Sequence, residues 1–398
     1  MKKKVVLAFS GGLDTSYCAK FLTDDLGYEV HTVLVDTGGF DEEELKEIEK
    51  NALNLGVTKH ICINQVEKYY DECIKYLIFG NVLKNNTYPL SVSAERMFQA
   101  LAVSEYAKSI QADAVAHGST GAGNDQVRFD VVFHILLPGI EIITPIRDKK
   151  LSREDEIAYL KSKGVVRDWV KAVYSINKGL WGTSVGGKET LTSHQYLPDD
   201  AWPTPVTKKK PENIILNFTH GELTGINNIP MKPVDAINFL KKTAQPFGIG
   251  RDIHVGDTII GIKGRVGFEA AAPLIILKAH HLLEKHTLTK HQLFWKDILA
   301  DLYGTMLHEG QFLDPIMRDI ESFFTSSQKT VTGNVEVQLN PYYFTLIGIQ
   351  SDYDLMSSKF GTYGEMNNLW SGNDVRGFSK IIANQAMIHR LVNQKNKL

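Results

Sequence analysis

Residues 10–16, Ser-Gly-Gly-Leu-Asp-Thr-Ser, constrain the fold of this chain more than any other segment. The apolar run before them, Val5 to Phe9, is typical of a buried strand, and the periodic stretch from Tyr17 to Leu26 predicts a helix. A strand that turns through two glycines into a helix brings backbone N–H groups and hydroxyls to one point. The sequence therefore predicts an anion site at this turn, with phosphate as its ligand.

This loop differs from two common phosphate loops. No lysine follows its second glycine, as in Gly-x-x-x-x-Gly-Lys-Ser/Thr, and its spacing is not that of Gly-x-Gly-x-x-Gly. It resembles the pyrophosphate loop of enzymes that activate an oxygen with ATP by adenylation. The glycines let the backbone approach a ligand, and Asp14 is suited to hold Mg²⁺ or to cap the helix. A capped turn without a ligand is the alternative interpretation.

The composition is that of an ordinary globular protein. With 398 residues and 43% hydrophobic content, two domains are expected. The formal charge of -2 shows no basic excess, so nucleic acid is not an expected partner. Cys18, Cys62 and Cys73 form no C-x-x-C pair, which indicates reduced thiols and a cytoplasmic protein. The apolar run after Lys4 is too short for a signal peptide, and no membrane partner is expected.

Short apolar runs alternate with amphipathic stretches in the first part of the chain. The runs at 5–9, 30–35, 60–63 and 112–116 predict strands, and helices are expected over about 14–26, 42–55, 65–78 and 93–110. This alternation is typical of an α/β fold with a parallel sheet, whose ligands bind at the carboxyl ends of the strands. The phosphate loop and the loop after the last run both lie at that edge.

Beyond about residue 170 the pattern changes to an α+β region. A charged connector at 206–211 precedes a predicted hairpin of 214–218 with 223–226. Helices are expected over 233–243, 279–308 and 312–326, a second hairpin over 335–350, and an amphipathic terminal helix over 378–392.

A second polar loop, residues 117–130, reads His-Gly-Ser-Thr-Gly-Ala-Gly-Asn-Asp-Gln-Val-Arg-Phe-Asp. Three glycines among many polar groups can wrap a small polar ligand. Arg128 suits a carboxylate and Asp125 an ammonium. An ordinary surface loop is the alternative interpretation.

Together these two motifs resemble the argininosuccinate synthase family, most closely over residues 3–165 and more loosely to the C-terminus, including 180–184. The resemblance implies a cytoplasmic ligase of arginine biosynthesis that adenylates the ureido oxygen of citrulline with Mg-ATP. The amine of aspartate then displaces AMP. It also implies a nucleotide-binding α/β domain over 1–168, an α+β synthetase domain over 169–375, and a C-terminal helix over 376–398 that reaches across the subunits of a homotetramer.

The resemblance assigns residues to each substrate. The ATP set is Ala8, Phe9, Ser10, Gly11, Gly12, Leu13, Asp14, Thr15 and Ser16, with Val35 and Gly118 near the nucleoside. The aspartate set is Thr120, Asn124 and Asp125, and the citrulline set is Tyr88, Ser93, Asn124, Arg128, Ser175 and Ser184. Catalysis by positioning and charge stabilisation would fall to Asp14, Asn124, Asp125 and Arg128. No set of protein metal ligands is assigned.

Two positions depart from the family pattern. The family's second domain typically carries Val-Glu-Asn-Arg and then Gly-x-Lys-Ser-Arg-Gly-x-Tyr-Glu, whose Glu and Tyr reach citrulline. Here these positions are Gly256 and Phe268. Losing the partner of a partly buried ammonium costs about 2 to 5 kcal/mol, so two explanations stay open. Either Asp257 or Glu269 replaces the charge, or the substrate is an N-acylated citrulline whose acyl group occupies the room at Gly256.

Other patterns have simpler interpretations. His280, His281, Glu284 and His286 predict a polar helix surface rather than a metal site. The acidic run 41–44 predicts the start of a helix. A tRNA-modifying enzyme that shares the pyrophosphate loop would need catalytic cysteines and a basic surface, which are not evident. A nucleotide-binding sensor without ligase activity is the remaining alternative.

Overall fold

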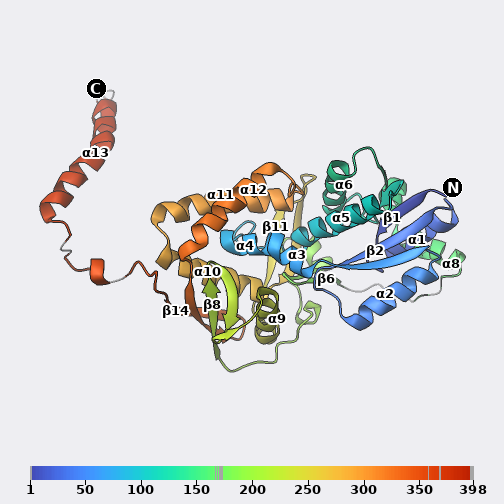
Figure 1. The fold of residues 1–398 in the computed structure, drawn as a ribbon, viewed down its shortest axis with the longest axis horizontal. Coiled ribbons are helices and arrows are strands. Elements are labelled where there is room, and N and C mark those ends of the chain that lie inside the picture. The colour runs from blue at the N-terminus through green and yellow to red at the C-terminus, as the bar shows by residue number, and fades with distance from the viewer. Residues whose placement is uncertain are drawn as a thin grey trace. The chain divides into compact units, whose positions relative to one another are not determined.

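A five-stranded parallel sheet organises the first part of the chain in this computed structural model (Figure 1). Its strand order is β3-β2-β1-β4-β5, so the first strand lies at the centre. The strands are β1 (Lys4–Ala8), β2 (Glu29–Asp36), β3 (Lys59–Asn64), β4 (Ala114–Ala116) and β5 (Glu141–Ile143). The predicted parallel sheet is confirmed, and the short strand β5 is an addition that no apolar run had indicated.

Helices cover both faces of this sheet, because successive side chains of each strand point to opposite faces and the apolar ones on both faces are buried. Val5 and Leu7 of β1 belong to one hydrophobic cluster, whereas Val6 belongs to another. The first cluster includes α1, α2 and α8, and the second includes α5 and α6. The helices are α1 (Leu13–Asp24), α2 (Glu42–Asn54), α5 (Ser91–Ser109), α6 (Asp125–Leu136), α7 (Pro145–Lys149) and α8 (Arg153–Ser162). The acidic start of α2 is confirmed, since Asp41 caps it within a capping box.

The helix expected over 65–78 forms as one continuous helical segment that contains a π-helical turn. α3 (Val66–Tyr69) continues through a π-helical turn (Tyr70–Ile74) into α4 (Lys75–Gly80). Asn81 ends α4 in a left-handed conformation, which asparagine tolerates.

Two antiparallel sheets form the α+β region. One has the order β11-β12-β7-β6 and the other β10-β9-β8-β13-β14, and the second contains both predicted hairpins. The strands are β6 (Ser175–Gly179), β7 (Gly182–Gly186), β8 (Glu212–Thr219), β9 (Glu222–Ile226), β10 (Ile229–Pro230), β11 (Arg251–Asp257), β12 (Lys263–Glu269), β13 (Gly333–Asn340) and β14 (Tyr343–Gln350). The helices are α9 (Pro233–Ala244), α10 (Ala271–Thr287), α11 (Lys290–His308) and α12 (Pro315–Ser327).

The stretch 279–308 is mainly helical, as expected, and it belongs to two helices because the chain breaks between α10 and α11. Thr289 is the N-cap of α11: its side chain accepts a hydrogen bond from the backbone N–H of Gln292, which completes a capping box. The apolar periodicity continues through the break, so the pattern alone does not reveal where one helix ends and the next begins.

The structure describes residues 2–165, 167, 169, 174–356, 358–366 and 369–394. They belong to two units, Met1–Asp352 and Tyr353–Leu398. The second unit contains α13 (Gly372–Gln394), where the terminal helix was expected. The boundary expected near residue 168 adjoins residues outside the described part and stays a prediction. No helix among the described residues has the length and apolar character needed to cross a membrane.

A buried polar network, rather than a polar surface, surrounds His280 and Glu284, so that expectation is wrong. Both side chains are fully buried. The Glu284 carboxylate accepts hydrogen bonds from Lys296 Nζ at 2.8 Å and from Asn81 Nδ2 at 2.6 Å. Gln328 donates to the other carboxylate oxygen at 2.9 Å. Lys296 on α11 therefore supplies the charge that lets α10 bury an acid.

Lys296→Met should destabilise the protein by about 3 to 5 kcal/mol, because it leaves the Glu284 carboxylate buried without its cation. Chemical unfolding measures the change. The double variant Lys296→Met/Glu284→Gln should recover part of the loss, and the exposed Lys290→Met is the control. Equal stability of Lys296→Met and Lys290→Met would contradict this account.

Candidate functional site

The two polar loops lie together because their strands are neighbours. β1 pairs with β4 through Leu7↔Ala116, so the loops that follow these strands leave the same edge of the sheet. The contact is close at Gly118. A Cβ there would lie 3.2 Å from the carbonyl carbon of Asp14 and 3.3 Å from the backbone nitrogen of Thr15. The loop at 117–124 therefore borders the phosphate loop so closely at Gly118 that a side chain there would crowd Asp14 and Thr15.

The phosphate loop has the backbone that its glycines predict. Gly11 has a φ of +77°, and a Cβ there would meet Ile48 Cγ1 at 3.1 Å. Gly12 is the N-cap of α1, and no side chain caps this helix. The suggestion that Asp14 caps it is therefore wrong: Asp14 lies in the first turn. The uncapped first-turn N–H groups favour an anion at this position.

Hydroxyl groups line the same loop. Ser16 Oγ donates to the carbonyl of Gly12 at 2.7 Å, and the hydroxyls of Ser10 and Thr15 lie 3.3 Å apart. Val35 is the residue before the end of β2 and is almost completely buried, as is Phe9 after β1. The segment thus combines amide and hydroxyl donors above an apolar base, an arrangement suited to a nucleotide.

Arg167 adds a cation that the sequence had not singled out. Its Nη1 donates to the carbonyl oxygen of Gly11 at 3.1 Å, and its guanidinium lies 4.9 Å from the ring centre of Trp169. A positive charge on the phosphate loop strengthens an anion site. The residue belongs to no motif, so only its place in the fold reveals it.

Asp125 lies between two guanidinium groups at the start of α6. Arg96 Nε donates to Asp125 Oδ2 at 3.0 Å, and Arg128 Nη1 donates to Asp125 Oδ1 at 2.9 Å. Burial alone would raise the pKa of Asp125, but the two guanidinium groups outweigh it and lower that pKa. Asp125 is therefore an ionised carboxylate shared by two arginines.

Arg128 reaches from α6 to two other helices. Nε and Nη2 donate to the carbonyl oxygen of His308 at the end of α11, at 3.0 and 2.9 Å. Nη2 also donates to Ser93 Oγ on α5 at 3.1 Å. Burial, followed by the charge of Arg128, lowers the pKa of His308 to about 3, so its imidazole stays neutral. His308 was not expected in this site, because 180 residues separate it from Arg128.

Arg96 extends the network to the sheet of β6 and β7. Its Nη2 donates to Asn177 Oδ1 at 3.1 Å, and Asn177 Nδ2 lies 3.5 Å from Ser184 Oγ. Ser175 is two residues before Asn177 on β6 and is exposed on the same face. Arg128 thus contacts Ser93 directly, and Arg96 connects to Ser184 through Asn177, with Ser175 on the same face of the sheet.

The turn between β11 and β12 contacts the second loop. Asn124 Oδ1 accepts a hydrogen bond from the backbone N–H of Ile259 at 2.8 Å. Thr120 lies in the exposed part of the loop, on the N-terminal side of Asn124. Residues of the expected aspartate set therefore border both the nucleotide-binding region and the α+β region.

Tyr88 is buried against the face of β11 and β12 that carries Gly256 and Phe268, the two positions that depart from the family pattern. Its hydroxyl accepts from the backbone N–H of Val92 at 3.1 Å. Its ring stacks on His254 with centroids 5.1 Å apart and lies 5.5 Å from Phe268. A Cβ at Gly256 would lie 2.5 Å from His254 Nε2. The imidazole of His254 thus occupies the room beside Gly256.

Neither Asp257 nor Glu269 replaces the missing carboxylate, so that explanation is wrong. Asp257 directly follows Gly256 on β11, and Glu269 directly follows Phe268 on β12. Because successive side chains of a strand alternate, both acids lie on the face of the sheet opposite to the departures. Asp257 is exposed and pairs with Lys263 at 2.5 Å. Glu269 is fully buried and pairs with Arg251 at 3.2 Å. Both charges are already compensated on the other face.

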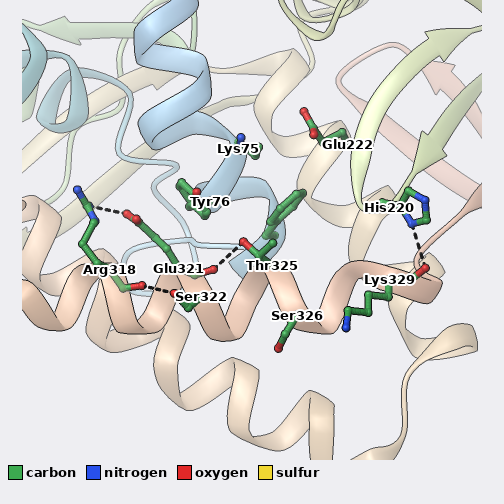
Figure 2. A pocket seen from close by; sticks show the side chains of 11 residues that line it. Lys75, Tyr76, His220, Glu222, Arg318, Glu321, Ser322, Thr325, Ser326 and Lys329 are labelled. Atoms are coloured by element: carbon green, nitrogen blue, oxygen red, sulfur yellow. Dashed lines mark hydrogen bonds and ion pairs between the residues drawn. The ribbon is translucent and has the colours of Figure 1, made fainter.

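A separate cavity of about 770 Å³ lies between α4, α12 and the β8–β9 turn (Figure 2). Several of its polar groups have partners within the protein. Glu321 accepts from Tyr303 and Arg318, Glu222 accepts from Tyr70, and His220 contacts the carbonyl of Lys329. Internal contacts account for this lining, and none of it comes from the two polar loops.

Comparison with known proteins gives one consistent result. Residues 4–166 match the family model described as "Arginosuccinate synthase N-terminal HUP domain", and residues 174–389 match "Arginosuccinate synthase C-terminal domain". A protein of Methanocaldococcus jannaschii named "Argininosuccinate synthase" is 38% identical over 98% of this chain and 99% of its own length. Proteins of the same name from Dictyoglomus turgidum and Xylella fastidiosa are 36% and 35% identical, over 99% and 98% of this chain and 99% and 98% of their own lengths.

Asp125→Asn should destabilise the protein by about 2 kcal/mol, because the neutral amide weakens two charge-assisted hydrogen bonds and leaves the cations of Arg96 and Arg128 without their anion. Chemical unfolding tests this, with the exposed Asp301→Asn as the control. If both variants unfold at the same denaturant concentration, Asp125 does not hold the network together.

Proposed function

This chain belongs to the argininosuccinate synthase family, and we propose that its two polar loops hold the ATP, citrulline and aspartate that the family joins. It is an ATP-dependent C–N ligase that forms argininosuccinate, AMP and pyrophosphate. The observation that carries the site assignment is the shared edge of β1 and β4, where the phosphate loop adjoins the network of Asp125, Arg96 and Arg128. On this proposal ATP binds beside the two amino-acid substrates.

The nucleotide site is proposed to be residues 8–16 with Val35 and Gly118. Loop amides and hydroxyls bind the phosphates, and Arg167 adds positive charge on the Gly11 carbonyl. Mg²⁺ fits this donor set, because it prefers carboxylate and phosphate oxygens and Asp14 stands among the hydroxyls. When bound, Mg²⁺ neutralises negative charge on the departing pyrophosphate.

The amino-acid substrates are proposed to meet beside Asp125. Thr120, Asn124 and Asp125 bind aspartate, and Tyr88, Ser93, Asn124, Arg128, Ser175 and Ser184 surround citrulline. The ureido oxygen of citrulline forms a bond to the α-phosphorus of ATP, and the bond from that phosphorus to pyrophosphate breaks. The aspartate amine then attacks the ureido carbon, loses a proton and releases AMP. The protein contributes alignment and charge stabilisation, so no covalent bond to the enzyme is required.

Pyrophosphate release by the purified protein tests this function. With Mg-ATP and aspartate present, citrulline should support release and N-succinylcitrulline should not, because the comparisons favour citrulline over its acylated forms. Product formation should require all three substrates.

Three outcomes of this assay differ in meaning. Release with citrulline supports the ligase described above. Release only with the acylated compound would mean that Gly256 and Phe268 mark a changed substrate. ATP binding without release in either reaction would favour the sensor and contradict the ligase.

Self-association through α13 is the proposed basis of a homotetramer. This helix exposes many apolar side chains, among them Ile381 at 76% and Ile388 at 51%, and none of its described residues is buried. Such an apolar face requires a partner, and the family resemblance points to other copies of the chain.

Ile381→Asp/Ile388→Asp should therefore lower the mass measured by light scattering from that of four chains, because charge disfavours burial of the helix face. Lys380→Asp, at an exposed position of the same helix, is the control. An unchanged mass for the double isoleucine variant would contradict this role of α13.

A further inference from the structure

Glu156 is a buried acid beside the phosphate loop that no motif assigns. It lies on α8, its residue is 3% exposed, and its Oε2 has no hydrogen-bond partner. Its carboxyl group contacts that of Asp14 in the first turn of α1. A buried acid with one oxygen unpartnered and a second acid as its neighbour is costly unless a cation or a proton compensates it.

The surroundings of Glu156 supply little positive charge. Arg153, one turn earlier on α8, is the cation that acts on it, but Arg153 also donates to the carbonyl oxygen of Trp169 at 3.3 Å. Without a compensating charge, this pair of acids would also repel the phosphates of ATP.

Mg²⁺ is the ligand whose charge would offset both the repulsion between the two carboxylates and their repulsion of the ATP phosphates. In nucleotide sites it is held by one or two carboxylates together with substrate phosphate oxygens, rather than by a cage made of protein alone. Asp14 projects from the uncapped end of α1, and Glu156 reaches the same carboxyl group from α8. We propose that Glu156 and Asp14 together form the carboxylate side of the Mg²⁺ site that accompanies ATP.

This proposal deepens the proposed function at a residue that the resemblance does not assign, and it rests on that function only for the binding of ATP. It explains why a helix packed on α1 carries an acid on its buried side. It also gives Asp14 a role, since Asp14 does not cap α1. Glu154, two residues away on the same helix, is exposed and faces away from the loop.

Titration of Mn²⁺, monitored by electron paramagnetic resonance, measures this site directly. Mn²⁺ replaces Mg²⁺, and the complex contains full-length protein and ATP without citrulline or aspartate, so a failure of ligation would not affect the readout. Glu156→Gln should weaken Mn²⁺ binding at least about 10- to 100-fold, the loss that follows removal of a group that only supports a metal ligand. Glu154→Gln, the matched control, should bind Mn²⁺ like the wild type.

ATP affinity measured in EDTA separates a metal-binding role from a structural one. Glu156→Gln should bind metal-free ATP as tightly as the wild type or more tightly, because it removes a repulsive carboxylate. Glu156→Asp retracts the carboxylate by one methylene and should also weaken Mn²⁺ binding, which keeps the test available if the glutamine variant does not fold. Wild-type affinity for Mn²⁺ in the folded Glu156 variants would overturn the proposal and leave Glu156 as a protonated structural acid.

Discussion

The pairing of β1 with β4 is the constraint on which the rest of the site depends. More than 100 residues separate the two strands, yet their register places Val5 opposite Ala114 and Leu7 opposite Ala116. Because both strands run in the same direction, the loops after them must share one edge. Replacing Gly118 by any other residue would interfere with this contact, since a Cβ there would crowd the backbone of Asp14 and Thr15.

The second constraint is electrostatic, because the carboxylate of Asp125 connects elements of the parallel-sheet region with elements of the α+β region. Asp125 binds Arg96 and Arg128, Arg96 reaches Asn177 on β6, and Arg128 reaches His308 at the end of α11. Each of these partners comes from a different element. The position of Asp125 therefore depends on the packing of the α+β region as well as on the parallel sheet, so changes far from the loops can alter the site.

The sequence predicts the parts of this protein that local patterns encode. The parallel sheet, both hairpins of the α+β region and the phosphate loop followed from periodicity and glycine placement. Arg167, Glu156 and His308 did not, because each acts through a partner far away in the sequence. The break before Thr289 was hidden by continuous apolar periodicity. His280 looked like a surface residue because the lysine that allows its neighbour Glu284 to be buried lies on the next helix.

The departures at Gly256 and Phe268 show why a charge cannot be moved along a strand by one residue. Successive side chains of a strand point to opposite faces, so Asp257 and Glu269 are excluded by geometry although they are adjacent in sequence. On the face of Gly256 and Phe268, the positive charge of Lys84 helps lower the pKa values of His254 and His308, although burial is the larger cause. The acceptors brought to this face include the hydroxyls of Ser175 and Ser184 and the amide of Asn177. The register also places the exposed Asp252 opposite Phe268, on the face of Gly256. Of the three acids on β11 and β12, Asp252 is therefore the one whose carboxylate shares the face of the two departures, because strand alternation turns Asp257 and Glu269 to the other side.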